Sequence, residues 1–319
     1  MSELDLIRDY FSRIGVSRRD VVLGVGDDCA LLRVSADVEL AVSIDTLVAG
    51  VHFLPDCDPE GLGHKSLAVG LSDLAAMGAQ PAWATLALTL PEANRPWLDA
   101  FCRGFGMLAA EHDVQLVGGD TTRGPLSVTV QVHGLAPVGS AVRRSGAHPD
   151  DRVWVSGTLG DAGLALRRLR AGEGVPPWVG NRLNRPVPRV ELGIALRGIA
   201  SAMIDLSDGL TADLAHILEA SGVGAEITLS ALPLSSEVAE YVAASDDWGL
   251  PLASGDDYEL CFTLPPDRCA TLDILARRSD CRLTPIGVIT EQLGLRCVLA
   301  DRTEWRSGLL GYDHFPDEG

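Results

Sequence analysis

The chain has 319 residues, which is more than one ordinary core and suits two domains of about 150 residues each. Its hydrophobic residues (46%) and charged residues (22%) are those of a globular protein, and no apolar run reaches the roughly 18 residues that span a bilayer, so we expect no membrane contact. The formal net charge of −18 and the lack of a basic stripe argue against a nucleic-acid-binding surface.

The N-terminal stretch and the cysteines indicate a cellular compartment. The stretch MSELDLIRDYFSRIG has the pattern of an amphipathic helix with charges throughout, so we expect neither a signal peptide nor a membrane anchor. The seven cysteines include no CxxC pair, and most of them adjoin apolar residues. This usage is typical of reduced thiols, and we therefore expect a cytoplasmic protein.

The first half of the chain alternates helical and strand-like patterns. We expect helices over 5–14, 63–78 and 95–112, and strands over 40–44, 82–90, 114–118 and 127–137. The polar segment 139–152, GSAVRRSGAHPDDR, contains glycine and proline and is typical of a crossing between domains.

The second half continues this alternation. We expect strands over 153–157, 225–229, 258–264, 284–289 and 295–299, a strand running into a turn over 201–209, and helices over 158–172, 189–200, 210–222, 235–245 and 267–278. The pattern predicts an α+β or α/β protein of two domains, with residues 1–140 in the first and 150–319 in the second.

Short motifs flanked by glycine or serine place acids at the ends of these elements. The acids are Asp27, Asp28, Asp45, Asp73, Asp120, Asp205, Asp208, Asp256 and Asp257. Each acid by itself is commonly a turn residue or a helix N-cap. Their number favours a function, because three of them follow apolar strands and one sheet could gather them at one rim. Those three are Asp28, Asp45 and Asp120.

Asp73 is the acid that turn chemistry explains least. It stands among Leu71, Leu74 and Met77 on an apolar helix, where a carboxylate must be paired or bound to a metal. Converging carboxylates repel one another unless divalent cations lie between them. Oxygen ligands with few histidines point to several Mg²⁺ ions rather than to zinc.

Magnesium in such a protein most often accompanies phosphate, and the common phosphate-binding motifs are missing. A Walker P-loop needs a glycine before its lysine, but the only lysine, Lys65, follows His64. The stretch GVGDDCA lacks the third glycine of a dinucleotide fingerprint, and neither HRD nor DFG occurs. The remaining way to hold a triphosphate uses Mg²⁺ on aspartates such as Asp120, backbone N–H groups at Gly118 and Gly119, and an arginine such as Arg144.

Nine motifs in series resemble those of the thiamine-monophosphate kinase family and cover the chain nearly end to end. They are GVGDDCALL, DTLVAGVHF, SDLAAMGAQPAWATLALTLP, VGGDTTRGP, VRRSGAHPDD, VSGTLGDAGLAL, IDLSDGLTADLAHI, GDDYELCFT and GYDHF. The resemblance implies a two-domain fold like that of aminoimidazole ribonucleotide synthetase, with the N-terminal domain pairing across a homodimer and ATP between the domains. The implied reaction converts ATP and thiamine monophosphate to ADP and thiamine diphosphate with several Mg²⁺ ions.

The resemblance also implies roles for individual residues. Metal ligands would be Asp28, Ser43, Asp45, Asp73, Asp120, Asp205 and Asp208, together with the backbone oxygen of Ile44, where the family often has a hydroxyl residue. Contacts to ATP would come from Gly119, Asp120, Arg144 and Ser207, and contacts to the thiamine phosphate from His52, Asp256 and Tyr312. Asp256 stands where the family commonly has glutamate, so its reach to substrate is shorter by one methylene.

The sequence also bears on the mechanism of phosphoryl transfer and on two alternative functions. Apart from Cys29 and His52, no plausible nucleophile lies near the acids in the sequence, so we expect direct in-line transfer without a covalent phosphoenzyme. A second possibility is another ATP-using enzyme of the same fold, of the ring-forming purine-biosynthesis, selenophosphate-synthetase or hydrogenase-maturation type. A third, a non-catalytic Ca²⁺-binding module, would need an EF-hand loop, and DLSDGLTADL lacks that spacing.

Overall fold

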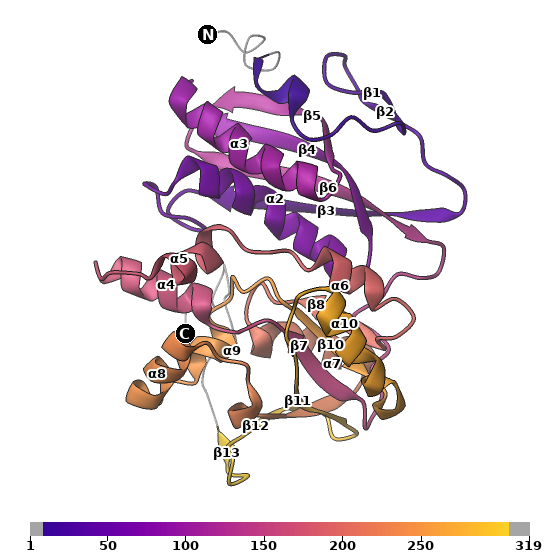
Figure 1. Cartoon of the computed structure of the whole chain (residues 1–319), viewed down its shortest axis with the longest axis vertical. Coiled ribbons are helices and arrows are strands. Elements are labelled where there is room, and N and C mark those ends of the chain that lie inside the picture. Colours follow the sequence, from indigo (N-terminus) through magenta and orange to yellow (C-terminus); the bar gives the residue numbers. More distant parts are fainter. Residues whose placement is uncertain (1–8, 306–319) are drawn as a thin grey trace. The chain divides into compact units, whose positions relative to one another are not determined.

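The computed structural model describes residues 9–305, and the chain forms two units (Figure 1). Unit 1 comprises Met1–Leu74 and Ala79–Ala141, and unit 2 comprises Ala75–Gly78 and Val142–Gly319. Each unit has its own main sheet and its own buried side chains. No helix within residues 9–305 has the length and apolarity that crossing a bilayer requires.

Unit 1 is built on a four-stranded sheet in the order β3-β6-β4-β5. β4 and β5 run parallel and α3 connects them, whereas β3 and β4 each pair antiparallel with β6. The strands are β3 (Val38–Val48), β4 (Gln80–Leu90), β5 (Gln115–Arg123) and β6 (Ser127–Pro137). The remaining elements are the 3-10 helix Phe11–Arg13, the short strands β1 (Val21–Leu23) and β2 (Leu31–Leu32), and the helices α2 (Pro59–Ala76) and α3 (Arg95–Glu111).

The helices α2 and α3 lie against one face of this sheet and cross each other in close contact (Figure 1). A Cβ at Gly63 of α2 would lie 2.0 Å from the carbonyl oxygen of Phe101, and a Cβ at Gly104 of α3 would lie 1.9 Å from that of Glu60. Only glycine permits these distances, so the two helices meet backbone to backbone. Lys65 lies on α2 and is only 3% exposed.

Unit 2 holds a seven-stranded sheet in the order β13-β12-β9-β11-β7-β10-β8. Only β9 and β12 run parallel among the neighbouring pairs of this sheet in the described residues. The strands are β7 (Arg152–Ser156), β8 (Ala202–Asp205), β9 (Gly224–Thr228), β10 (Leu260–Leu264), β11 (Leu283–Thr290), β12 (Gly294–Val298) and β13 (Glu304–Trp305).

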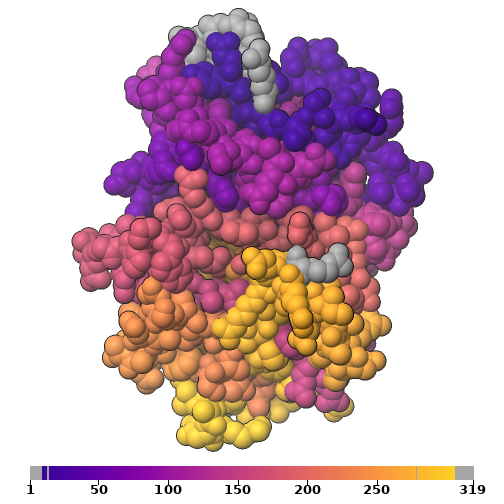
Figure 2. Space-filling view, viewed as in Figure 1, coloured from indigo at the N-terminus to yellow at the C-terminus, as the bar shows by residue number. Residues whose placement is uncertain are grey.

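Helices and 3-10 turns surround this sheet. They are α4 (Asp161–Arg170), α5 (Pro177–Asn184), α6 (Val190–Ala195), α7 (Leu210–Ser221), Leu229–Ala231, α8 (Ser236–Ser245), α9 (Gly249–Ala253), Pro266–Thr271 and α10 (Leu272–Arg278). α7 places Leu214 and Ile217 in the same apolar cluster as Val153 of β7 and Ile204 of β8. α4, α5 and α8 lie together at the surface (Figure 1 and Figure 2), where Trp178 donates to Glu237.

The expectation of a mixed α/β fold is confirmed, and two helices of unit 2 differ in extent. Of the helix expected over 5–14, residues 5–8 lie outside the described part; Asp9 is helical and Phe11–Arg13 form a 3-10 helix. The helix expected over 189–200 ends at Ala195, before Gly198 takes a φ of +67°. The segment 267–278 begins as a 3-10 helix after two prolines and becomes α-helical only at Leu272.

Candidate functional site

Three of the expected metal ligands meet in unit 1, between β3 and α2. Buried and exposed positions alternate along β3, so Ser43 and Asp45 face the same side as the buried Leu47. Asp73 of α2 reaches this side, because Ser43 Oγ donates a hydrogen bond to Asp73 Oδ2. Asp45 lies beside them, since a Cβ at Gly70 of the same helix would lie 3.4 Å from Asp45 Oδ2.

One oxygen of the Asp45 carboxylate has no hydrogen-bond donor from residues 9–305 in this position. Its Oδ2 atom is buried and has no hydrogen-bond partner among the described residues. Burial, reinforced by the negative charge of Asp73, raises the pKa of Asp45 to about 7. An orphaned carboxylate oxygen beside a second carboxylate and a hydroxyl is a set of hard oxygen donors. This donor set fits Mg²⁺, because a divalent cation would satisfy the oxygen and neutralise both acids.

Ile44 lies between these residues but its side chain is on the other face of β3. That side chain is 62% exposed, in line with Leu40 and Val42 on the same face. Any contact from Ile44 to a metal would therefore come from its backbone oxygen, as the sequence led us to expect. The contact itself stays a prediction.

Asp120 and Gly119 lie on β5, at the far side of the same sheet from Asp45. Asp45 pairs with Val130 of β6, and Asp120 pairs with Ala87 of β4, so two strands lie between the two acids. At the usual strand spacing this is roughly 14 Å. The two acids therefore belong to the same sheet but lie on its two opposite edge strands. No group of three or more His, Cys, Asp or Glu within residues 9–305 is arranged to hold a metal by itself.

Gly119 occupies a position that no other residue would fit. Its φ is +150°, and a Cβ there would lie 1.9 Å from the carbonyl oxygen of Leu86. The side chain of a larger residue would push β5 away from β4.

Asp28 lies on an exposed turn after β1, where Asp27 Oδ1 accepts from the Asp28 N–H at 2.8 Å.

In unit 2 a second set of expected residues follows β8. Asp205 ends this strand and is 4% exposed, and Ser207 and Asp208 form the loop that leads into α7. Asp213, on the first turn of α7, accepts from the backbone N–H groups of Asp208 and Gly209, each at 3.0 Å. Burial, followed by the charge of Asp208, raises the pKa of Asp213 to about 7. Asp213 therefore fixes the loop that carries Ser207 and Asp208.

The turn that carries Asp256 lies directly against this loop. The Asp256 N–H donates to the Ser207 carbonyl oxygen at 2.8 Å, and the Tyr258 N–H donates to that of Leu206 at 2.8 Å. A Cβ at Gly255 would lie 2.5 Å from the Ser207 oxygen. The expected substrate contact and the expected nucleotide contact are thus side by side within unit 2.

Three further expected residues have different outcomes. The Val48 N–H donates to His52 Nδ1 at 3.1 Å, so a neutral His52 ring carries its proton on Nε2 and can donate from there. Arg144 lies close enough to Asp213 for its positive charge to act against the raised pKa of that acid. Tyr312 lies outside the described residues.

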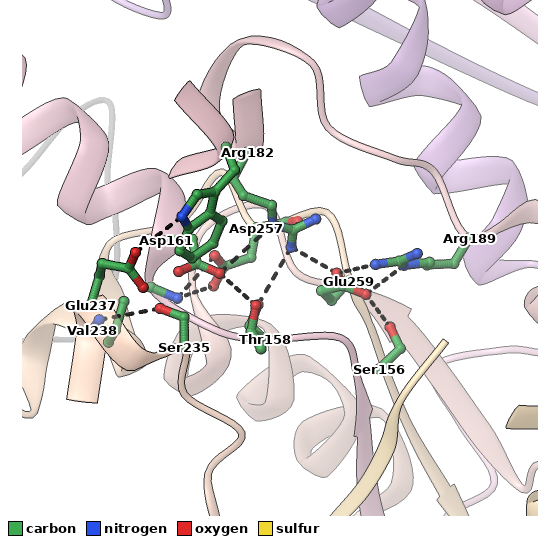
Figure 3. A network of polar contacts seen from close by, with 12 residues as sticks. Ser156, Thr158, Asp161, Arg182, Arg189, Ser235, Glu237, Val238, Asp257 and Glu259 are labelled. Atoms are coloured by element: carbon green, nitrogen blue, oxygen red, sulfur yellow. Dashed lines mark hydrogen bonds and ion pairs between the residues drawn. The ribbon is translucent and has the colours of Figure 1, made fainter. Parts of the chain in front are cut away.

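A network of polar contacts around the buried Glu259, three residues after Asp256, was not predicted from the sequence (Figure 3). Glu259 is fully buried and accepts two hydrogen bonds from Arg189, at 2.6 and 2.7 Å, and one from Arg182 at 2.7 Å. Ser156 Oγ donates to the same carboxylate at 2.5 Å. Burial alone would raise the pKa of Glu259, but the two arginines outweigh it and the pKa is lowered. The signal for this network was an acid in the apolar strand sequence YELCF, which requires a buried partner.

Comparison with known proteins identifies the family to which the two units belong. The family model described as "AIR synthase related protein, N-terminal domain" matches residues 26–136. The model of the corresponding C-terminal domain matches residues 148–299. The two units thus have the fold of the AIR synthase related proteins. A thiamine-monophosphate kinase of Salmonella typhimurium is 50% identical over 322 residues and covers 98% of each chain.

Two solved structures agree with this relative. The thiamine-monophosphate kinase of Stenotrophomonas maltophilia has a TM-score of 0.85 at 46% identity, covering 92% of this chain and 95% of its own. A structure described as AaThiL complexed with AMPPCP and TMP has a TM-score of 0.78 at 31% identity, covering 88% and 89%. The chain belongs to the thiamine-monophosphate kinase family, and the resemblance and fold class expected from the sequence are confirmed.

Proposed function

We propose that this protein is a thiamine-phosphate kinase, which transfers the γ-phosphoryl group of ATP to thiamine monophosphate. The observation that carries the proposal is the pairing of the two loops in unit 2, because the Asp256 N–H donates to the Ser207 carbonyl oxygen at 2.8 Å. The hydrogen bond places Asp256, whose carboxylate can bind a cationic thiazolium ring, beside the loop of Ser207 and Asp208. The side chains of that loop can bind a nucleotide and a metal ion. The 50% identity to a thiamine-monophosphate kinase and the relative described as complexed with AMPPCP and TMP support the same assignment.

The reaction follows from the chemistry of the two phosphates. A phosphate oxygen of thiamine monophosphate attacks the γ-phosphorus of ATP, the bond from that phosphorus to the β–γ bridging oxygen breaks, and ADP leaves. Asp28, Ser43, Asp45, Asp73, Asp120, Asp205, Asp208 and the backbone oxygen of Ile44 would hold Mg²⁺. When bound, Mg²⁺ supplies positive charge that neutralises the phosphate oxygens.

The protein's own groups bind and orient the two substrates. The sequence Gly118–Gly119 carries no side chain that would shield the backbone of β5 from a phosphate, and Arg144 and Ser207 contact the nucleotide. His52 donates from Nε2 to the phosphate of thiamine monophosphate, and Asp256 and Tyr312 contact its thiamine part. Catalysis then depends on positioning and on neutralisation of charge, without a covalent nucleophile.

The assembly and domain roles complete the proposal. Leu40, Val42 and Ile44 form an exposed apolar row on β3, at 46%, 50% and 62% exposure, and β3 is an edge strand of its sheet. Such a row on an edge strand supports pairing of two N-terminal domains in a homodimer. We assign ATP and Mg²⁺ binding and dimerisation to residues 1–140, completion of the substrate site to residues 150–319, and the cytoplasm as the compartment.

The test is formation of thiamine diphosphate from Mg-ATP and thiamine monophosphate, followed by chromatography. We expect stoichiometric ADP and thiamine diphosphate, no thiamine diphosphate when thiamine replaces its monophosphate, and inversion at a chiral γ-phosphorus. ATP consumption without thiamine diphosphate would contradict the proposal. Retention at phosphorus, or a labelled protein after incubation with γ-labelled ATP alone, would contradict direct transfer.

A further inference from the structure

The turn that carries Asp256 has an unusual backbone. Gly255, Asp256 and Tyr258 all have positive φ values, of 70°, 61° and 49°. A left-handed conformation is unfavourable at a residue with a side chain, and it persists only where the surroundings fix it. For a tyrosine this conformation is rare, so the turn must be held from outside.

Buried acids on both sides of Tyr258 hold the turn. Asp257 is 4% exposed, and its two carboxylate oxygens accept from the Gly160 N–H at 3.0 and 3.1 Å. Glu259 is fixed by Arg182 and Arg189 (Figure 3), and its carbonyl oxygen accepts from the Leu206 N–H at 2.8 Å. The chain between these anchors therefore has little freedom to relax.

The strained conformation aims the Tyr258 hydroxyl at Asp256. Tyr258 Oη donates to Asp256 Oδ1 at 3.1 Å, two residues back along the same turn. The Tyr258 side chain is buried, with 8% exposure for the residue, whereas Asp256 is only partly buried. Tyr258 is thus placed to act on the Asp256 carboxylate, and Asp256 is placed to meet a ligand.

We propose that Tyr258 is a positioning residue that fixes the Asp256 carboxylate for the thiamine part of the substrate, an inference that rests on the proposed function. The hydroxyl holds one carboxylate oxygen, so the acid keeps a single orientation toward a cationic ring. The buried anchors at Asp257 and Glu259 keep Tyr258 in the conformation that makes this contact.

The test compares Tyr258→Phe with Tyr241→Phe in the full chain. The two substitutions each remove a tyrosine hydroxyl that donates to an aspartate of unit 2 at 3.1 Å, Asp256 in one case and Asp247 in the other. For Tyr258→Phe we expect the KM for thiamine monophosphate to rise about tenfold, as for a lost hydrogen bond to a charged group. The KM for ATP and the melting temperature should stay close to those of the wild type, and Tyr241→Phe should leave both KM values unchanged.

A double-mutant cycle with Asp256→Ala separates positioning from a structural role. If Tyr258 acts through Asp256, Tyr258→Phe adds nothing to the KM effect of Asp256→Ala. Additive effects, an equal rise of the KM for ATP with a lower melting temperature, or an unchanged KM in Tyr258→Phe would each overturn the inference. So would an Asp256→Ala variant with the wild-type KM for thiamine monophosphate. A wild-type protein that forms no thiamine diphosphate would instead overturn the proposed function.

Discussion

Ser43 Oγ donates a hydrogen bond to Asp73 Oδ2 and so ties strand β3 to helix α2 beside the buried carboxylate of Asp45. A hydroxyl can orient an acid but carries no charge to compensate it. The contact therefore leaves two carboxylates close together, and burial, reinforced by the charge of Asp73, raises the pKa of Asp45.

Asp73→Asn removes one of these two charges. Because like-charge repulsion is relieved, we expect the melting temperature in EDTA to be unchanged or higher. The stabilisation that Mg-ATP gives the wild type should be mostly lost, since a ligand stabilises only as far as it binds the folded state. Activity should fall about 100-fold or more. Melting curves in EDTA and in Mg-ATP measure both effects.

The control for this experiment is Asp37→Asn, the same chemical change at an exposed position of unit 1. It should leave both melting curves and the activity as they are. An Asp73→Asn protein that is destabilised equally with and without Mg-ATP would show that Asp73 has only a structural role.

Alanine substitutions at Gly157 and Gly172 distinguish the cost of a steric clash with Glu259 from the cost of a strained backbone. Gly157 and Gly172 have similar φ values, +59° and +70°, but a Cβ at Gly157 would lie 2.0 Å from Glu259 Oε1, whereas nothing lies within 4 Å of one at Gly172. Gly172→Ala should cost about 1–2 kcal/mol of unfolding free energy through the left-handed backbone alone. Gly157→Ala should cost about 3 kcal/mol more, because it displaces the buried Glu259 carboxylate from two partly buried arginines. Urea unfolding of both variants gives the difference, and equal costs would contradict this reading.

Glu259 also predicts how stability responds to acid. Its pKa is lower in the folded protein than the ordinary 4.5, so its ionised form stabilises the fold above that pH, and this contribution is lost as the pH falls through the folded pKa. Glu259→Gln should therefore be less stable than the wild type by a constant amount near neutral pH. The gap should narrow below about pH 4.5. Unfolding free energies measured from pH 7 to pH 3 test this, and a gap that widens toward acid would refute it.

Val42 tests the proposed homodimer. Val42→Lys places a charge in the exposed apolar row of β3, and we expect the homodimer to dissociate to monomers. Met107→Lys is the matched control, because Met107 is also exposed in unit 1 but lies on α3. Light scattering after gel filtration measures the mass. A wild-type monomer, or a dimer that survives Val42→Lys, would argue against pairing through this row.

The sequence predicted most of the strands and long helices because their apolar periods are strong. β6, for example, spans Ser127–Pro137, the range expected from SVTVQVHGLAP. It missed α5 and α9, in which Pro177 and Pro251 lower helix propensity although proline is tolerated in a first turn.

For the site, the sequence predicted a set of acids but not how the fold distributes them. Asp45 and Asp73 come together because α2 lies against β3, whereas the position of Asp73 on an apolar helix had indicated only that its carboxylate needs a partner or a metal. The strand order, which separates Asp120 from Asp45, depends on long-range pairing and leaves no local pattern. The role of Glu259 was also hidden, because its arginine partners lie 70 and 77 residues away.

Lys65, the only lysine of the chain and 3% exposed on α2, provides a chemical probe of one half of the molecule. An amine-reactive reagent can modify its side chain only when the packing around this position of α2 opens. Because unit 2 contains no lysine, the rate of modification at Lys65, read by mass spectrometry, measures the opening of unit 1 without any signal from the other unit.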